Sequence, residues 1–261
     1  FDTSRVTDMS FMFRECQNLV DLNLQSFDFS NVTEFSGFMD YGGLYNGQPW
    51  ENLFTEIPQK RVLKDSSGYS EDDSVFFSEV LRKEVTAIMF LDSLENAPAD
   101  AWDLSEAYDR SVLGWVTGMP GNYHLFIAAD GGVIANQDSA YAFSYYTNLK
   151  TIEFNGCYDT SLVKDMQKMF SNCYNLTELD LSCFDTSKVE SVYGMFDGCS
   201  SLTGLDLSSF DTSRVTDMGW MFYGCKNIAT LNLSSFDTSR VTDMSWMFDG
   251  CSSLTGLDLS S

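Results

Sequence analysis

Apolar side chains recur along much of this chain at fixed places inside a repeating unit, with polar residues between them. The opening aromatics of three clear units, Phe184, Phe210 and Phe236, follow one another at intervals of 26 residues. Counting each opening aromatic as offset 0, the unit that begins at Phe210 has apolar residues that share their offsets with the other units. They are Val215, Met218, Met221, Phe222, Cys225, Ile228, Leu231 and Leu233. A long, strict period is typical of coils stacked on one another, so we predict that these positions face inward.

The end of each unit alternates apolar and polar residues over a short stretch. Leu202, Leu205 and Leu207 stand around Gly204 and Asp206, a pattern that predicts a strand with one buried face. Strands of successive coils would pair in parallel, about 4.8 Å apart. The predicted fold is a β-rich repeat solenoid with a parallel β spine.

Looser copies of the unit begin at Phe1, Phe27 and Tyr158, and the pattern fails between about 40 and 139. All the prolines lie in that interruption, so the regular coils are free of proline. We predict four segments, which are repeat coils of a first array at 1–40, an irregular insert or linker at 41–84, a β-rich cap at 85–139, and a repeat array at 140–261.

The interrupted region divides into loop-like and strand-like stretches. We expect loop at 42–54, a polar stretch at 64–74 and a short helix or coil at 74–84. Strands are predicted from the apolar runs at 85–91, 111–116, 123–128 and 132–136, with the last two joined by a hairpin turn at Asp130-Gly131-Gly132. The cap would cover the open first edge of the second array.

The small polar residues after each opening aromatic, such as Asp211, Thr212 and Ser213, stand where the coil must turn. Their side chains can accept hydrogen bonds from nearby backbone N–H groups, which predicts turn chemistry. A stacked ladder of oxygens that captures a cation is the alternative.

A second acidic series stands at offset 22, on the outward face of the predicted strands. It consists of Asp180, Asp206 and Asp258, with Asn232 between the last two. This series is either a tolerated solvent-exposed ladder or a weak calcium site.

The unit resembles that of the BspA-like leucine-rich repeat surface proteins of bacteria, whose repeats look like LxxLDLSSFDTSxVTxMxxMFxxC. The resemblance is close over 1–39 and 158–261. The stretch 85–157 resembles the segment that begins many such arrays, through VTAIMFLDSL, DAWDLS, SVLGWV and IAADGGVIAN. The resemblance implies a leucine-rich repeat-like solenoid and a secreted, cell-surface role in adhesion or interaction. It carries over no catalytic residue.

The net charge of the chain limits the classes of partner that it can bind. The chain has 38 acidic and 15 basic residues, a net charge of −23, so we expect no nucleic-acid partner and no binding to anionic lipid. No run of apolar residues is long enough for a spanning helix, so we expect no membrane insertion by this segment. The acidic surface suits a soluble extracellular protein, or one that binds basic peptides or divalent cations. Since the sequence begins and ends on unit boundaries, we expect any signal or anchor to lie outside it.

The cysteines form two series. Those at offset 15 are predicted to be buried free thiols; they are Cys16, Cys173, Cys199, Cys225 and Cys251. Cys157 and Cys183 precede opening aromatics on adjacent coils, and they are either free or bridged. Neither series has the spacing of a zinc site, so we predict no metal.

Catalytic signals are weak. His124 is the one histidine, which excludes a His-dependent triad on count alone. Acid pairs such as Asp72 and Asp73, or Asp103 and Glu106, are too common in so acidic a chain to indicate a glycosidase. We predict a protein that is no enzyme and needs no cofactor.

The outward offsets vary, which is how repeat proteins present a binding surface. We predict a ligand-binding face at Trp220, Tyr223 and Trp246, with Tyr193 at its edge, because Trp220 and Trp246 share offset 10 on successive coils. Packing of both indoles over the coil beneath is the alternative. The expected function is adhesion to a protein or glycan on another cell or matrix. An inert stalk, or a hydrolase with its site in 41–139, are the alternatives, and the oligomeric state stays open.

Overall fold

The computed structural model describes residues 62–63, 70, 72–75, 80–107 and 109–259, together with two short strands further upstream. The predicted first array at 1–40 and most of the insert at 41–84 lie outside the described residues. The upstream strands, β1 (Leu44–Tyr45) and β2 (Gln48–Pro49), pair antiparallel where we expected only loop.

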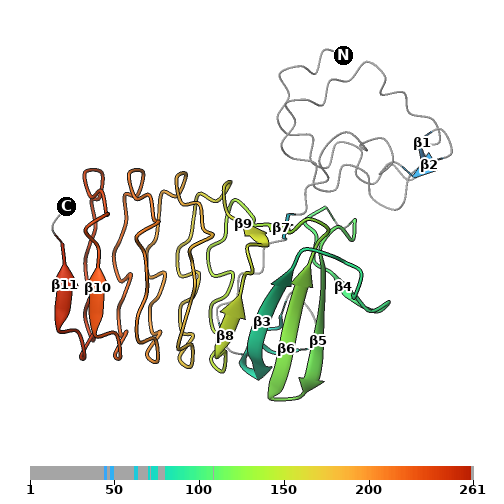
Figure 1. Ribbon diagram of the computed structural model, residues 1–261, viewed down its shortest axis with the longest axis horizontal. Coiled ribbons are helices and arrows are strands. Elements are labelled where there is room, and N and C mark those ends of the chain that lie inside the picture. Colours follow the sequence, from blue (N-terminus) through green and yellow to red (C-terminus); the bar gives the residue numbers. More distant parts are fainter. Residues whose placement is uncertain are drawn as a thin grey trace, which may run out of the picture.

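A five-stranded sheet occupies the region predicted as the cap. Its strands are β3 (Val85–Leu91), β4 (Trp102–Asp103), β5 (Leu113–Met119), β6 (Asn122–Ala128) and β8 (Thr151–Glu153). They lie in the order β4-β5-β6-β3-β8 (Figure 1). The three longer runs that the alternation pattern selected, at 85–91, 111–116 and 123–128, are confirmed as strands within a few residues.

The hairpin predicted at Asp130-Gly131-Gly132 is wrong. The tight turn lies instead at Pro120-Gly121, between the antiparallel strands β5 and β6, and Gly121 has the left-handed φ of 80° that such a turn requires. The chain after β6 leaves the sheet, and β7 (Val133–Ile134) pairs in parallel with β9 (Tyr158–Asp159). A turn does form at Asp130-Gly131, where the Gly132 N–H donates to the Ala129 carbonyl at 2.9 Å, but it joins no pair of antiparallel strands. The Gly131 N–H donates to the Asp92 carbonyl at 2.7 Å.

Strand β3 lies at the junction between this sheet and the repeats. It pairs in parallel with β6 on one side and with β8 on the other. Strand β8 belongs to the first coil of the second array, so β3 covers that edge, as the cap was expected to do. The limits of the four predicted segments stay predictions.

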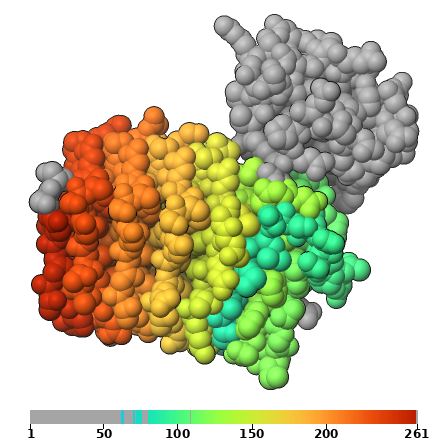
Figure 2. All heavy atoms as spheres, viewed as in Figure 1, coloured from blue at the N-terminus to red at the C-terminus, as the bar shows by residue number. Residues whose placement is uncertain are grey.

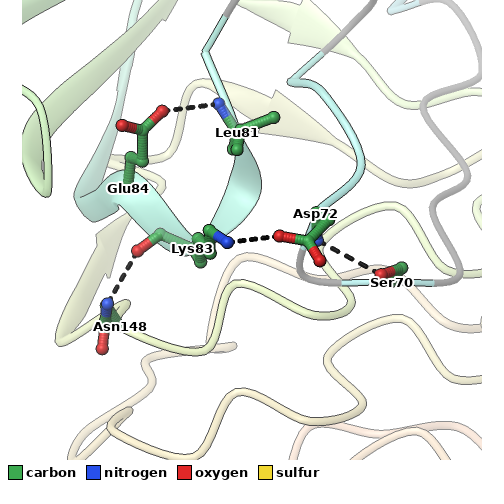
Figure 3. Close-up of polar contacts among 6 residues, drawn as sticks. All are labelled: Ser70, Asp72, Leu81, Lys83, Glu84 and Asn148. Atoms are coloured by element: carbon green, nitrogen blue, oxygen red, sulfur yellow. Dashed lines mark hydrogen bonds and ion pairs between the residues drawn. The ribbon is translucent and has the colours of Figure 1, made fainter.

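The stretch 74–84 ends in a 3-10 helix, η2 (Arg82–Glu84), which approaches the first coil (Figure 3). The Asn148 side-chain amide donates to the Lys83 carbonyl at 2.7 Å, and the Lys83 ammonium pairs with the Asp72 carboxylate. The Glu84 carboxylate accepts the Leu81 N–H at 3.0 Å and so closes the turn. These contacts fasten the end of the insert to the repeats.

Arg82 makes the same connection from inside the core. Its side chain is fully buried, and Nη1 donates to the carbonyls of Ser144 at 2.7 Å and Tyr141 at 3.3 Å. The guanidinium also lies 5.0 Å from the ring centroid of Tyr146. A buried cation is tolerated here because carbonyl oxygens and an aromatic face replace its water.

From about 138 onward, successive stretches of chain lie side by side as narrow coils (Figures 1 and 2). Between offsets 8 and 14, backbone N–H groups at even offsets donate to carbonyls one coil further on, as Lys168 does to Tyr193 at 2.8 Å and Gly194 to Gly219 at 2.8 Å. Groups at odd offsets close turns within the coil, as Ser171 does to Lys168 at 3.0 Å. A parallel series of bridges therefore runs through Asp138, Asp165, Ser191, Asp217 and Asp243.

This ladder corrects the predicted position of the spine. The leucine-bearing stretch at 202–207 is not a strand, and among the described coils only β8, β10 (Thr230–Asn232) and β11 (Gly256–Asp258) are strands at that place. Strands β10 and β11 do pair in parallel, in the predicted register. Most backbone hydrogen bonds between coils lie at offsets 7–14, because every second N–H there points at the neighbouring coil.

A stack of phenylalanine rings at offset 12 fills the centre of the coils. The ring centroids of Phe170 and Phe196 lie 5.9 Å apart and those of Phe196 and Phe222 lie 5.6 Å apart, with planes within 15° of parallel. Phe143 and Phe248 extend the stack at its two ends. The inward positions predicted from the repeat are confirmed by burial of Val215, Met218 and Met221. The assignment to a leucine-rich repeat solenoid stays a prediction.

Candidate binding face

The four residues predicted to bind a ligand lie together around Trp220 and are here called the aromatic column: Tyr193, Trp220, Tyr223 and Trp246. The ring centroid of Trp220 is 4.5 Å from that of Tyr223, 5.9 Å from that of Trp246 and 6.5 Å from that of Tyr193. Trp220 therefore contacts the other three. Residues of successive coils meet here because equal or adjacent offsets lie side by side.

The column is reachable from solvent. Tyr193, Trp220 and Tyr223 are half-buried, while 59% of the surface of Trp246 is exposed. The two indole planes are inclined by 40°, so they are neighbours one coil apart but not parallel plates. Part of each ring packs on the next, and part is left for contact with another molecule.

The backbone at offset 10 is left-handed in every described coil. Its φ is 52° at Lys168, 58° at Gly194, and 59° at both Trp220 and Trp246. Bulky residues rarely adopt this conformation, because the Cβ atom crowds the following carbonyl at a cost of about 1–2 kcal/mol. Glycine suits the position, so two tryptophans there are costly to the fold, as residues at functional sites commonly are.

Acidic side chains flank the aromatic column at offset 7. Asp217 Oδ1 accepts the Gly219 N–H at 2.9 Å, and Asp243 Oδ1 accepts the Ser245 N–H at 2.7 Å. That bond lowers the pKa of Asp243, so its exposed carboxylate is charged at neutral pH. The column therefore lies in a negative field.

A lysine, Lys168, occupies offset 10 two coils before Trp220. Lys168 Nζ lies 5.6 Å from the ring centroid of Tyr193 and 3.7 Å from Asp197 Oδ2. Burial raises the pKa of Asp197, and the Lys168 ammonium partly offsets that rise. The chain's own cation thus rests between an aromatic ring and a carboxylate at the edge of the column.

The Asp-Thr-Ser residues after each opening aromatic are used within the fold, which confirms the predicted turn chemistry. Asp211 Oδ1 accepts the Ser213 N–H at 2.9 Å. The buried Thr186 hydroxyl accepts the Asp211 N–H at 2.8 Å and donates to the Asp211 carbonyl at 3.1 Å. Threonine therefore joins one coil to the next, a role that reasoning from a single unit missed.

The acidic series at offset 22 is exposed and serves the same local purpose. Asp180 and Asp206 each accept the N–H of the serine two residues on, at 2.9 and 3.0 Å. Those bonds lower the pKa of both carboxyls. Within the described part of the chain no group of three or more histidine, cysteine, aspartate or glutamate side chains could hold a metal ion. Calcium binding at this series stays untested.

The offset-15 thiols are buried at Cys173, Cys199 and Cys225 and half-buried at Cys251, as predicted; Cys16 lies outside the described residues. Each described thiol of this series has a partner that the sequence did not reveal; for example, Cys199 Sγ donates to the Phe170 carbonyl at 3.2 Å. Cys157 and Cys183 are both free, so the structure contains no bridge between them.

The residues weighed as catalytic do not come together. Asp72 pairs with Lys83, and Asp73 accepts the Ser70 N–H at 2.8 Å. Asp103 accepts the N–H of Ser105 at 3.0 Å. His124 is exposed on β6. Asp73 and Asp103 are therefore bound to near neighbours in the sequence, and Asp72 to a lysine.

A separate apolar pocket lies on the last described coils. Its walls are Met218, Leu233, Phe236, Thr238, Met244, Met247, Phe248 and Leu259. None of the four aromatic-column residues lines it.

No helix in the described ranges is long and apolar enough to cross a membrane.

Comparison with known proteins gives one match. A family model described as "Mycoplasma protein of unknown function, DUF285" matches residues 1–52 and 137–260. The matched ranges contain the repeat units and leave out the sheet β4-β5-β6-β3. No curated protein and no solved structure matches the chain.

Proposed function

The chain belongs to the family described as "Mycoplasma protein of unknown function, DUF285", and we propose that it is a non-enzymatic binding segment whose aromatic column contacts a protein or glycan on another cell or matrix. The stacked coils would form a leucine-rich repeat-like solenoid of the BspA-like kind. The location would be extracellular or at the cell surface, in keeping with that resemblance.

One observation carries this proposal. Two tryptophans occupy a left-handed backbone position that glycine fills one coil earlier, and they expose ring surface on the outside of the stack. A position that serves packing alone has no need of a large side chain in strained backbone. Large aromatic surfaces in contact with solvent are typical of binding sites for sugar rings and apolar side chains.

The test is removal of both indoles. We expect Trp220→Ala with Trp246→Ala to abolish binding to partners found on a glycan and matrix-protein array, while the melting temperature changes by only a few degrees. The matched control is Trp115→Ala, since Trp115 is a half-buried indole on β5 that stacks on Phe126, away from the column. That variant should bind normally.

A large loss of stability with residual binding intact would assign both indoles to packing and contradict the proposal. An inert stalk would show no saturable binding in the unaltered protein. A hydrolase would show turnover of mixed glycan or peptide substrates that a single carboxylate change in 41–139 abolishes.

A further inference from the structure

The space around Gly219 brings an aromatic ring and two carboxylates together beside the column. A Cβ atom placed on Gly219 would lie 3.3 Å from a ring carbon of Tyr193, 3.3 Å from Asp217 Oδ1 and 3.4 Å from Asp243 Oδ1. The residue itself contributes no side chain. Groups that attract a cation by two different mechanisms, a ring face and a negative charge, therefore meet at one place.

Lys168, two coils before Gly219, shows what this arrangement accepts. The Lys168 stem crosses Gly194, where an added Cβ would be 3.0 Å from its Cγ and 3.2 Å from its Cε. Its ammonium then reaches the Tyr193 ring and the Asp197 carboxylate. The fold thus seats a basic side chain across the coil, between ring and acid.

No lysine or arginine stands at offset 10 in the next three coils, of which the first has Gly194 there. Trp220 and Trp246 take that position, and the nearby offsets 7 and 13 supply Asp217, Asp243 and Asp249. Asp243 and Asp249 are exposed. The rings and carboxylates continue past the point where the chain's own cation ends.

We propose that the aromatic column binds a basic peptide segment of a partner, whose arginine or lysine side chains lie on Trp220 and Trp246 and pair with Asp217 and Asp243. This inference rests on the proposed function and names the chemistry of its partner. Charge complementarity selects a cationic occupant, because the whole chain carries −23 and an acidic segment would be repelled.

The probe is a synthetic ten-residue peptide of alternating arginine and glycine, with the glutamate–glycine peptide as its counterpart. Binding is followed by tryptophan fluorescence at two salt concentrations. We expect the arginine peptide to bind, the glutamate peptide not to bind, and affinity to fall with salt. Replacing both tryptophans by alanine should abolish the binding.

The decisive comparison uses two double variants with equal loss of charge. Asp217→Asn with Asp243→Asn should weaken binding of the arginine peptide about tenfold, since two charge contacts are removed, one at the half-buried Asp217 and one at the exposed Asp243. Asp180→Asn with Asp206→Asn should weaken binding of that peptide less than about twofold. Those two aspartates are matched controls because they too accept the N–H of the residue two positions on. Asparagine keeps the capping oxygen in all four positions.

Equal weakening by the two double variants would show attraction to overall charge and would overturn the inference. Column-dependent binding of a neutral glycan or an uncharged peptide, with no binding of the arginine peptide, would overturn the inference and leave the proposed function standing. Absence of any partner that depends on the tryptophans would remove both.

Discussion

At the scale of single residues, the three buried thiols of the offset-15 series, Cys173, Cys199 and Cys225, differ from the other described cysteines in exposure. Burial raises the pKa of Cys173 to about 12 and holds the pKa of Cys199 well above its ordinary value. Thiolate is the reactive form, so these groups should be inert at neutral pH. Cys183 is exposed, although partial burial of its thiol raises its pKa as well.

We therefore expect iodoacetamide at pH 8 to label Cys183 first and to leave Cys173, Cys199 and Cys225 unmodified in the folded protein. Peptide mapping by mass spectrometry measures the order. The control is the same reaction in denaturant, where all the cysteines should react. Labelling of Cys199 as fast as Cys183 would show that the inward assignment of this series is wrong.

The left-handed backbone at Trp246 allows a second test on single residues. In ordinary backbone, glycine is less stable than alanine by about 0.5–1 kcal/mol, but a left-handed position reverses that order. We expect Trp246→Gly to be more stable than Trp246→Ala by about 1 kcal/mol in urea unfolding. Both variants lose the same indole contacts, so the difference isolates the backbone.

Lys226 supplies the control for that comparison, because it is exposed and is not among the residues with positive φ. There Lys226→Gly should be less stable than Lys226→Ala. If alanine were the more stable substitution at both places, the strain that we assign to offset 10 would be absent.

At the scale of elements, three successive coils are each joined to the next by a buried threonine, namely Thr160, Thr186 and Thr212. The Thr186 hydroxyl both donates to the Asp211 carbonyl and accepts the Asp211 N–H. Valine has nearly the same shape but would leave that N–H unpaired. We expect Thr186→Val to reduce the free energy of unfolding by about 1–3 kcal/mol, measured by urea denaturation.

Thr216 is the matched control, since its exposed hydroxyl makes a single bond between coils, to the Glu190 carbonyl at 3.2 Å. Water can replace that bond, so Thr216→Val should change stability by no more than about 0.5 kcal/mol. Equal losses at the two positions would mean that the buried hydroxyl has no special part in joining the coils.

Much of this element-level structure followed from the sequence, because burial depends on pattern. The repeat identified the inward residues and the neighbours in the aromatic column, and alternation identified β3, β5 and β6. The position of the inter-coil ladder did not follow, since it depends on backbone dihedrals that the apolar pattern does not encode. In the sequence, the signal for left-handed backbone was Gly194 at offset 10 together with the glycines at offset 14. The glycine pair in Asp130-Gly131-Gly132 led us to predict a hairpin that does not form.

The site was predictable only in part for the same reason. Equal offsets predicted that Trp220 and Trp246 would be neighbours, and the period alone gives that result. The approach of Asp217 and Asp243 to the Tyr193 ring depends on how closely Gly219 lets two coils approach. That distance is a property of packing and appears only in three dimensions.

At the scale of the whole molecule, the charge of −23 opposes folding through self-repulsion, while local bonds favour particular carboxylates. Two classes of aspartate respond to pH in opposite ways. Bonds from the serine two residues on lower the pKa of Asp180, Asp185, Asp206, Asp211, Asp237 and Asp243. Burial raises the pKa of Asp165 and Asp197.

The sign of each contribution follows from linkage. A lowered pKa gives stability that is complete above the unfolded value of about 3.9 and is lost as the pH falls through the folded value. A raised pKa means that the folded protein takes up a proton first, so stability rises as the pH falls from the raised value toward about 3.9. Protonation also weakens the overall repulsion in that interval.

We therefore expect the melting temperature to rise as the pH falls from 7 to about 4.5 and to drop steeply below about 3.5. Thermal melts at constant ionic strength measure this profile. Asp165→Asn should flatten the rise, because it removes one group with a raised pKa and keeps an oxygen to accept the Gln167 N–H, now at 2.7 Å. Asp206→Asn should leave the rise unchanged, since the lowered pKa of Asp206 affects stability only below about pH 3.9. A melting temperature that declined steadily from pH 7 to 4.5 would show that neither buried carboxylates nor self-repulsion governs the stability of the stack.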